Sequence, residues 1–282
     1  MELAYRPDFS EKVAVVTGAG GVLCSLMCKA LAACGAKVAL LGRRTETLRP
    51  VADEILSEGG IAECFVADVL DAEAVEKAHR DILQKFGKCD LLINGAGGNA
   101  PQATTQKEYY FPGDADGEGQ SFFHLKPESI SGVFSLNFTG TLIPTQVFAK
   151  DMLGRKNCAI LNISSMNAFT PLTKIPAYSG AKAAVSNFTQ WLAVHFSKEG
   201  IRVNAIAPGF FSTAQNAALL WNADGTPTAR TGKILAATPM ERFGNPEELL
   251  GATLFLLDTA ASSFITGVVL PIDGGFSAYS GV

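Results

Sequence analysis

Tyr178 and Lys182 form a pair of side chains that suits acid–base chemistry. They lie four residues apart in "AYSGAKAAV", which opens an apolar stretch to about Ser197, so a helix would place both on one face. A positive charge beside a tyrosine hydroxyl favours the phenolate and lowers a pKa that is ordinarily about 10. The pair therefore predicts proton transfer at a carbonyl or hydroxyl oxygen, although ordinary helices also carry such pairs by chance.

Two polar residues upstream add to this pair. Ser165 closes the apolar run "AILNISS", and Asn137 lies in "SLNFTG". Either residue alone would be expected to make a hydrogen bond at a strand end or a helix kink. Together with Tyr178 and Lys182, in this order and at these spacings, they form a specific pattern.

A glycine-rich turn near the start of the sequence suits phosphate binding. The stretch "TGAGGVLC" follows the apolar run "KVAVV", and a turn of this kind between a strand and a helix points backbone N–H groups at a phosphate. Because Val22 is β-branched and poorly suited to a positive φ, we expect Gly20 and Gly21 to supply the unusual dihedrals. Cys24 is small enough to let the following helix pack closely. The turn is predicted to hold the pyrophosphate of a dinucleotide.

The elements that must position these residues alternate between apolar runs and segments with helical periodicity. The runs are "VAVVTG", "KVALLG", "AECFVADV", "CDLLINGAG", "CAILNISS", "IRVNAIAPG" and "GVVLPIDGG". Runs that are apolar on both faces fit a parallel sheet covered by helices on both sides. We therefore expect an α/β fold, a doubly wound parallel sheet (Rossmann fold) in a single domain over residues 1–282, with the polar motifs gathered at the carboxyl ends of the strands.

Residues 99–129 interrupt this alternation with a long polar insert after the fourth strand. The segment carries glycine, proline and acidic residues and has no sustained periodicity. A long loop in a compact domain is usually either functional or disordered, and the sequence leaves both readings open.

Composition argues against several classes of partner. The sequence has 23 basic and 27 acidic residues, a formal net charge of −4, and no basic run that would follow a phosphate backbone, so nucleic acid is not an expected partner. The apolar stretch "VLCSLMCKALAACGAKVALLG" is interrupted by two lysines, which argues against a membrane span. The start "MELAYRPDFSEK" lacks the features of a signal peptide, so we expect a cytoplasmic protein.

Cysteine and histidine usage gives no sign of a disulfide framework or a metal site. The six cysteines lack CxxC spacing and are predicted to be mostly buried free thiols. His79, His124 and His195 are scattered and lack a ligand motif, so no metal is expected. A GxSxG motif is also absent, which argues against a hydrolase.

Nearly the whole sequence resembles the short-chain dehydrogenase/reductase family, from "KVAVVTG" through "NGAG" and "YSGAK" to "ITGVVLPIDGG". The resemblance implies a catalytic tetrad of Asn137, Ser165, Tyr178 and Lys182. In this reading Tyr178 transfers the proton, Lys182 binds the ribose and lowers the tyrosine pKa, Ser165 orients the substrate oxygen, and Asn137 holds a water. The sequence departs from the family pattern TGxxxGxG at its last two glycines, where it has Val22 and Cys24.

The same resemblance implies a nicotinamide dinucleotide as cofactor. Gly42 stands where a carboxylate would bind the ribose of NAD(H), and Arg43 with Arg44 suits a 2′-phosphate, so NADP(H) is favoured and NAD(H) is possible. The cofactor-binding residues expected on this basis are Gly18, Gly20, Gly21, Val22, Leu23, Arg43, Arg44, Asp68, Val69, Asn94, Ala96, Gly97, Tyr178, Lys182, Pro208, Gly209, Phe211 and Thr213.

Within the family, "GGVLCS", the insert, "APGFFSTAQNAALL" and "DGTPTAR" resemble the D-mannonate oxidoreductases of the short-chain type, also called fructuronate reductases. This resemblance implies a small-molecule sugar acid as substrate, D-fructuronate reduced to D-mannonate. Gluconate or polyol dehydrogenases of the same family are the alternative, and a non-catalytic NADP-binding regulator is the alternative from another class. The substrate contacts expected are Ser165, Asn167, Lys174, Asn99 and Arg230, with Lys107 and Lys126 as further candidates for a carboxylate partner.

The helix expected to carry Tyr178 also predicts self-association. It presents Phe188, Trp191, Leu192 and Phe196, more apolar surface than one sheet face should cover. A homotetramer, as the family resemblance implies, is expected, unless the insert covers this surface within one molecule.

Overall fold

A parallel β-sheet of seven strands forms the centre of the molecule in the computed structural model, which describes residues 1–213, 220–222 and 224–281. The strands are β1 (Val13–Thr17), β2 (Lys37–Gly42), β3 (Ile61–Val66), β4 (Leu91–Asn94), β5 (Cys158–Ile163), β6 (Ile201–Pro208) and β7 (Val269–Ile272). Their order in the sheet is β3-β2-β1-β4-β5-β6-β7, and every pairing is parallel. Each of the seven predicted apolar runs forms one of these strands, so the predicted α/β doubly wound Rossmann fold is confirmed.

The α-helices among the described residues lie in the segments that connect the strands. Their bounds are α1 (Val22–Ala33), α2 (Thr45–Ser57), α3 (Ala72–Lys85), α4 (Pro127–Phe134), α5 (Gly140–Met152), α6 (Pro176–His195), α8 (Ala229–Ala236), α9 (Leu250–Leu257) and α10 (Thr259–Ser262). Helix α6 starts with Pro176 at a first-turn position, where the missing N–H costs nothing. It therefore carries Tyr178 in its first turn.

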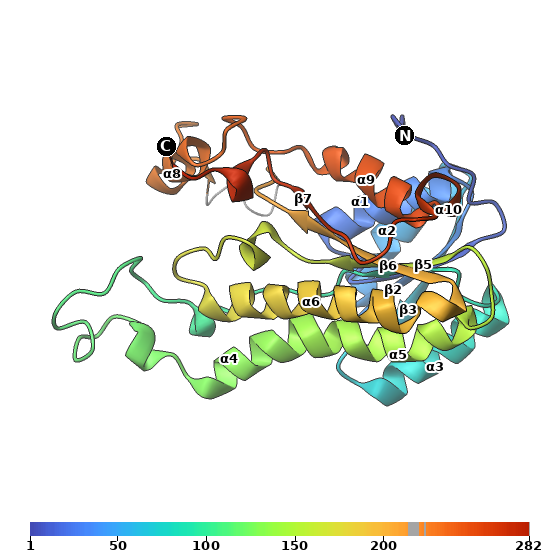
Figure 1. The fold of residues 1–282 in the computed structure, drawn as a ribbon, viewed down its shortest axis with the longest axis horizontal. Helices are drawn as coiled ribbons and strands as arrows, with labels where there is room; N and C mark the ends of the chain where they lie inside the picture. The colour runs from blue at the N-terminus through green and yellow to red at the C-terminus, as the bar shows by residue number, and fades with distance from the viewer. Residues whose placement is uncertain (214–219, 223, 282) are drawn as a thin grey trace.

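Helices cover both faces of the sheet, because the central strands are apolar on both sides (Figure 1). Alternate residues of β1 pack into two separate cores, Ala14 and Val16 on one face and Val13 and Val15 on the other. Helices α1, α2 and α9 pack on the first core, and helices α3, α5 and α6 pack on the second.

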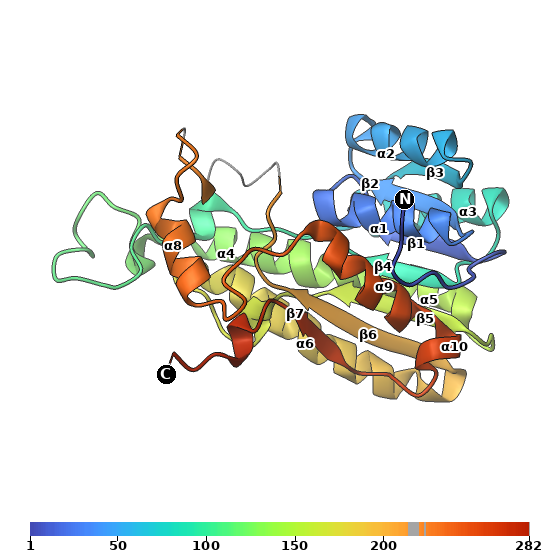
Figure 2. The ribbon, with the colours of Figure 1, turned by 90° about the horizontal axis from the view of Figure 1, so that it is seen from above.

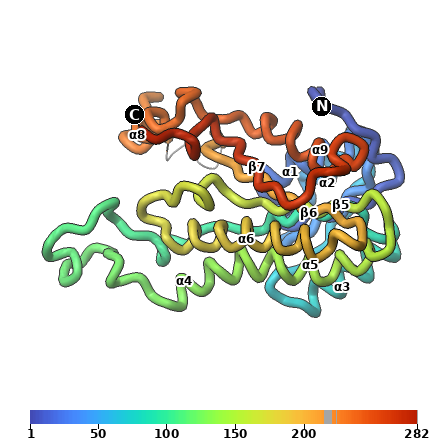
Figure 3. The backbone as a smooth tube through the Cα atoms, in the orientation of Figure 1, coloured from blue at the N-terminus to red at the C-terminus, as the bar shows by residue number. Residues whose placement is uncertain are grey.

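The segment between β4 and α4 contains only two short 3₁₀ turns, Pro101–Ala103 and Phe122–His124. It extends away from the sheet as a long arm, the teal and green loop in Figures 2 and 3. The last three residues of the expected insert, 127–129, belong to α4 instead, because Pro127 opens that helix. The insert is therefore residues 99–126.

All six cysteines are free thiols, five of them buried and Cys64 half-buried. Burial raises the pKa of each thiol, for Cys24 and Cys34 to about 11. Among the residues that the structure describes, no group of histidines, cysteines and carboxylates has the arrangement of a metal site. Within the same residues, no helix has the length and apolar character that a bilayer crossing requires.

Candidate active site

The carboxyl ends of β1, β4 and β5 are joined by side-chain hydrogen bonds. Thr17 and Asn94 are register partners, as are Asn94 and Asn162. The Thr17 hydroxyl accepts hydrogen bonds from the N–H groups of Gly95 (3.0 Å) and Ala96 (3.2 Å). The Asn94 amide donates to Asn162 Oδ1 at 2.9 Å, so its side chain lies in a buried network rather than at the surface of the crevice. These bonds fix the two glycine-rich turns side by side.

The glycine-rich turn after β1 takes its unusual dihedral from Gly18, which has φ +66°, and a Cβ there would lie 2.9 Å from the Ala96 backbone. The expectation that Gly20 and Gly21 supply positive φ values is wrong. Gly21 is extended, with φ −79°, and caps α1. Gly20 is required for space instead, because a Cβ there would lie 2.6 Å from Thr47 Oγ1.

The amino end of α1 is suited to an anion. It has no side-chain cap and no acidic residue in its first turn, so the N–H groups of Val22 and Leu23 remain for a ligand. Cys24, where the family pattern has a glycine, is buried, and its Sγ occupies the space in which a Cβ of Gly95 would lie. The departure from the usual glycine spacing is therefore compatible with close packing of α1 on the neighbouring turn.

Asn137 lies in a one-turn π-helix, Ser135–Thr139, between α4 and α5. It is fully buried, donates from Nδ2 to the carbonyl oxygens of Gly98 (2.7 Å) and Val133 (2.8 Å), and accepts from the Gly98 N–H. A Cβ at Gly97 would lie 2.6 Å from Asn137 Oδ1 and 3.2 Å from Lys182 Nζ. Gly97 therefore lets the turn after β4 approach both side chains.

Ser165, Tyr178 and Lys182 come together beyond the end of β5. The Ser165 side chain lies close enough to the Tyr178 hydroxyl to lower the pKa of that hydroxyl. Ser165 also caps the following turn by accepting from the Asn167 N–H at 3.3 Å. Lys182 is buried, its Nζ donates to the Ile163 carbonyl oxygen at 2.7 Å, and it lies 5.6 Å from the centre of the Tyr178 ring.

The pKa of Tyr178 is not lowered, as the sequence led us to expect, but raised. Burial raises the pKa of Tyr178 above 10.0, and the neighbouring Ser165 side chain offsets this rise only in part. Burial also lowers the pKa of Lys182 to about 8. The expected lowering of the tyrosine pKa by Lys182 does not dominate, because the lysine ammonium is directed to the Ile163 carbonyl and desolvation acts on both groups.

The residues expected at the adenosine end lie beyond β2 and β3. Arg43 is exposed, and its Nη1 lies 4.0 Å from Asp68 Oδ2. Arg44 caps α2 with its backbone. Asp68 accepts from the Leu70 N–H, and Val69 is buried. Position 42 is a glycine and has no carboxylate, but the carboxylate of Asp68 lies beside Arg43.

The motif after β6 forms the next part of the same edge. Gly209 leaves no room for a side chain, because its Cβ would lie 2.5 Å from the Asp273 Cβ. Pro208 ends β6, Phe211 packs its ring against Gly244, and Thr213 follows. Residues 214–219 of "APGFFSTAQNAALL" lie outside the described residues.

The five expected substrate contacts fall into two groups. Ser165 and Asn167 are buried at the end of β5, and Asn167 Oδ1 has no hydrogen-bond partner among the residues that the structure describes. The other three are at the surface or partly covered: Asn99 donates to Thr104 Oγ1 in the insert, Lys174 is half-buried with φ +74°, and Arg230 is exposed on α8.

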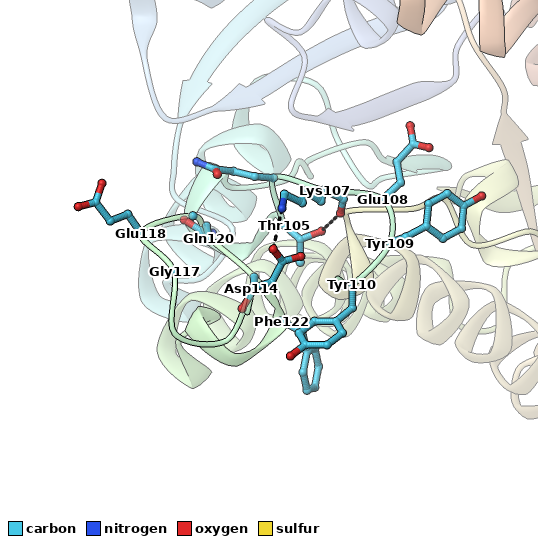
Figure 4. Close-up of a pocket in the computed structure, with 13 residues that line it drawn as sticks. Thr105, Lys107, Glu108, Tyr109, Tyr110, Asp114, Gly117, Glu118, Gln120 and Phe122 are labelled. Carbon is cyan, nitrogen blue, oxygen red and sulfur yellow. Dashed lines mark hydrogen bonds and ion pairs between the residues drawn. The ribbon is translucent and has the colours of Figure 1, made fainter. Parts of the chain in front are cut away.

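The two further candidates for the carboxylate partner lie in the insert. Lys107 has its charge matched there, because its Nζ lies 2.6 Å from Asp114 Oδ1. The insert encloses a cavity of about 480 Å³ around this pair (Figure 4). Lys126 is exposed and caps α4 with its backbone. Because Lys107 is already paired with Asp114, it is a weaker candidate for the partner of a substrate carboxylate.

Several residues that support the site are not among those predicted from the sequence. They include Thr17, which joins the two turns, Gly95, which receives Cys24, and the Ile163 carbonyl, which orients Lys182. Thr17 and Gly95 stand inside the quoted motifs "TGAGGVLC" and "NGAG", so their position at a strand end was the available signal. A backbone carbonyl leaves no trace in the residue types.

A Rossmann sheet with this tyrosine, lysine and serine at its carboxyl edge is the arrangement of a nicotinamide-dependent oxidoreductase. Residues 12–222 match the family model for short chain dehydrogenases, and the chain belongs to this family. It is therefore an oxidoreductase of the short-chain type, and members of the family use NAD(P).

Three comparisons cover nearly the whole chain. An uncharacterized oxidoreductase of Haemophilus influenzae is 57% identical over 282 residues, which are 100% of this chain and 99% of that protein. The crystal structure of a proposed D-mannonate oxidoreductase from the same species, with bound NAD, has a TM-score of 0.95 and 58% identity and covers 98% of each chain. Gluconate 5-dehydrogenase of Gluconobacter oxydans is 33% identical over 264 residues, 94% of each protein.

Proposed function

We propose that the protein catalyses the reversible, NAD(P)-dependent reduction of D-fructuronate to D-mannonate. The observation that carries the reaction type is the grouping of Ser165, Tyr178 and the buried Lys182 beyond the end of β5, with Lys182 Nζ 5.6 Å from the centre of the Tyr178 ring. The substrate class is supported by the full-length similarity to the proposed D-mannonate oxidoreductase. The alternative within the family, a gluconate or polyol dehydrogenase, is supported by the lower similarity to gluconate 5-dehydrogenase.

In this proposal the side chains hold and move one proton. Bound NAD(P) supplies or accepts the hydride. Tyr178 donates its phenolic proton to the substrate oxygen during reduction, and Ser165 donates a hydrogen bond that orients this oxygen. The ammonium of Lys182 stabilises the phenolate that forms, while Asn137 holds the turn after β4 against Lys182.

A sugar acid also needs a partner for its carboxylate, because burying an unpaired charge is costly. We assign this role to Lys174, which is half-buried four residues before Tyr178. Its left-handed backbone, φ +74°, is uncommon for a residue other than glycine and is held by a hydrogen bond from the Thr105 N–H to its carbonyl oxygen at 2.8 Å. The buried, unpartnered Oδ1 of Asn167 suits a sugar hydroxyl.

For the cofactor, two observations support opposite preferences. Arg43 and Arg44 favour NADP(H) by their charge. The contact of Arg43 with Asp68, together with the NAD bound in the similar Haemophilus structure, favours NAD(H). We propose that the enzyme accepts both cofactors and that Arg43 sets the ratio.

A substrate panel tests the function directly. Purified protein should oxidise NAD(P)H at least about tenfold faster, by kcat/KM, with fructuronate than with the neutral ketose fructose. Lys174→Met should lose much of this preference with little change in the cofactor KM, and Lys174→Gly, which suits the left-handed backbone, should lose it equally. Equal rates on the acid and the neutral sugar would contradict a sugar-acid substrate.

The regulator hypothesis is tested by the same assay. A nucleotide-binding regulator of this fold would be expected to have a broken tyrosine–lysine pair, whereas Tyr178 and Lys182 are both present. Consumption of NAD(P)H with any keto acid would exclude it.

We also propose a cytoplasmic homotetramer. Six free thiols suit a reducing compartment. Association is supported by an apolar groove of about 500 Å³ between α5 and α6, lined by Leu153, Phe188, Trp191 and Leu192 among others. Trp191 is 55% exposed in the single chain.

A further inference from the structure

The insert is attached to the catalytic helix at its base. Ala103 is fully buried and packs with Val133 and Ala177, and Ala100 and Tyr178 pack against this small core. The Thr105 N–H donates to the Lys174 carbonyl oxygen at 2.8 Å. The first part of the insert is therefore held against the residues that precede and include Tyr178.

Further along, the insert contacts a second element, helix α8. Lys233 of α8 donates to both carboxylate oxygens of Glu108, at 2.9 and 2.8 Å. In Figure 4 the Glu108 carboxylate points away from the Lys107 and Asp114 pair that the insert encloses. Glu108 is thus the acidic group through which the insert contacts α8.

The order of the strands shows which parts of the sheet edge the ion pair of Glu108 and Lys233 connects. The insert follows β4, and α8 lies in the segment between β6 and β7, where Thr238, two residues beyond the helix, lies against Gly274. In the sheet, β5 lies between β4 and β6, and Ser165 follows β5. The contact of Glu108 with Lys233 therefore joins the two sides of the edge at which Ser165 and Tyr178 lie.

One cation is bound to the Glu108 carboxylate, and a second acts on it electrostatically. The hydrogen bond from Lys233 is the main cause of its lowered pKa, and the charge of Lys174 contributes as well. The Lys233 side chain is 67% exposed, and that of Glu108 is 31% exposed. Exposed ion pairs contribute little to stability, so another carboxylate can replace Glu108 at small cost.

We propose that Lys233 and Lys174 form the entry site for the carboxylate of the substrate and that Glu108 occupies this site between turnovers. An acidic substrate takes over the ion pair with Lys233, whereas a neutral sugar leaves Glu108 in place. Glu108 and Lys233 are then specificity-determining residues. The inference rests on the proposed sugar-acid function and adds to it the exchange of one carboxylate for another.

The test compares charge-removing variants on an acidic and a neutral substrate. Lys233→Met should raise the KM for fructuronate about tenfold, leave the rate with fructose unchanged, and be rescued in large part by Lys233→Arg. Glu108→Gln should instead lower the KM for fructuronate several-fold, because the competing carboxylate is gone. Lys77→Met, which breaks the exposed ion pair with Asp81 on α3, is the matched control and should change neither substrate.

Two outcomes would overturn the exchange. One is an equal loss of activity with fructuronate in Glu108→Gln and Lys233→Met, which would show that the ion pair only holds the insert against α8. The other is an unchanged KM for fructuronate in Lys233→Met. If the wild-type enzyme does not prefer fructuronate, the proposed function fails, and a binding measurement then tests the inference separately. In the absence of cofactor, D-gluconate should bind more tightly to Glu108→Gln than to wild type. It should bind more weakly to Lys233→Met than to wild type. The reverse order, or no difference, would reject the site.

Discussion

Tyr178 is the residue on which proton transfer depends in the proposed mechanism. Tyr178→Phe should lower kcat by at least about 100-fold, because the proton donor is lost, while the Kd for the cofactor stays nearly unchanged. Steady-state rates with fructuronate and a fluorescence titration with NADH measure the two effects. Turnover within about threefold of wild type would show that another group supplies the proton.

Arg43 determines cofactor choice if its charge meets a 2′-phosphate. Arg43→Asp should shift the preference toward NAD(H) by about 1–3 kcal/mol, since a charge-assisted contact is lost and a ribose acceptor is gained. The measurement is the ratio of kcat/KM for NADPH to that for NADH. An identical ratio in the variant and the wild type would remove Arg43 from cofactor recognition.

Lys182 makes stability depend on pH in an unusual direction. Its pKa is about 8 in the folded protein, against 10.5 ordinarily, so between these values the unfolded protein binds more protons than the native one. Stability should therefore rise with pH through this window, by at most about 3 kcal/mol from this residue. Urea unfolding of wild type and Lys182→Met at pH 7.5 and 9.5 isolates the effect. The variant should lack this gain, and parallel pH dependence of both proteins would contradict the buried, destabilised ammonium.

Among the elements, the turn after β4 carries the strictest spatial requirement. Gly97→Ala should push Asn137 and Lys182 apart, because the new Cβ would lie 2.6 Å from Asn137 Oδ1, and kcat should fall at least about tenfold. Gly98→Ala is the neighbouring control, since its Cβ would meet nothing closer than Leu136 Cδ2 at 4.0 Å. Equal activity of the two variants would contradict the requirement.

The strands could be predicted from the sequence, whereas two local features that depend on distant segments could not. Seven apolar runs predicted seven strands, because a strand buried on both faces has a continuous apolar sequence. The glycine turn was mispredicted, since the position of a left-handed residue depends on the approach of Ala96 from a distant segment. The contact of Glu108 with Lys233 was beyond prediction, because it joins residues 125 positions apart through a loop without periodicity.

At the scale of the whole molecule, the groove between α5 and α6 predicts assembly. Trp191→Glu places a charge where apolar surfaces would meet, so the mass in light scattering should fall from that of a tetramer to that of a smaller species. Leu83→Glu alters an equally apolar, 41% exposed residue on α3 and should leave the mass unchanged. A monomeric wild type at micromolar concentration would contradict the proposed tetramer.

Alkylation of the buried free thiols can show which part of the molecule opens first. Burial shields the five thiols other than that of Cys64 and raises their pKa values, so alkylating reagents can react with these five only as the surrounding structure opens. Cys24 lies in α1 and packs against Gly95, whereas Cys158 begins β5 on the other side of β4 in the sheet. The order in which the two native cysteines are alkylated would therefore reveal which half of the sheet loosens first, and no cysteine has to be introduced for the measurement.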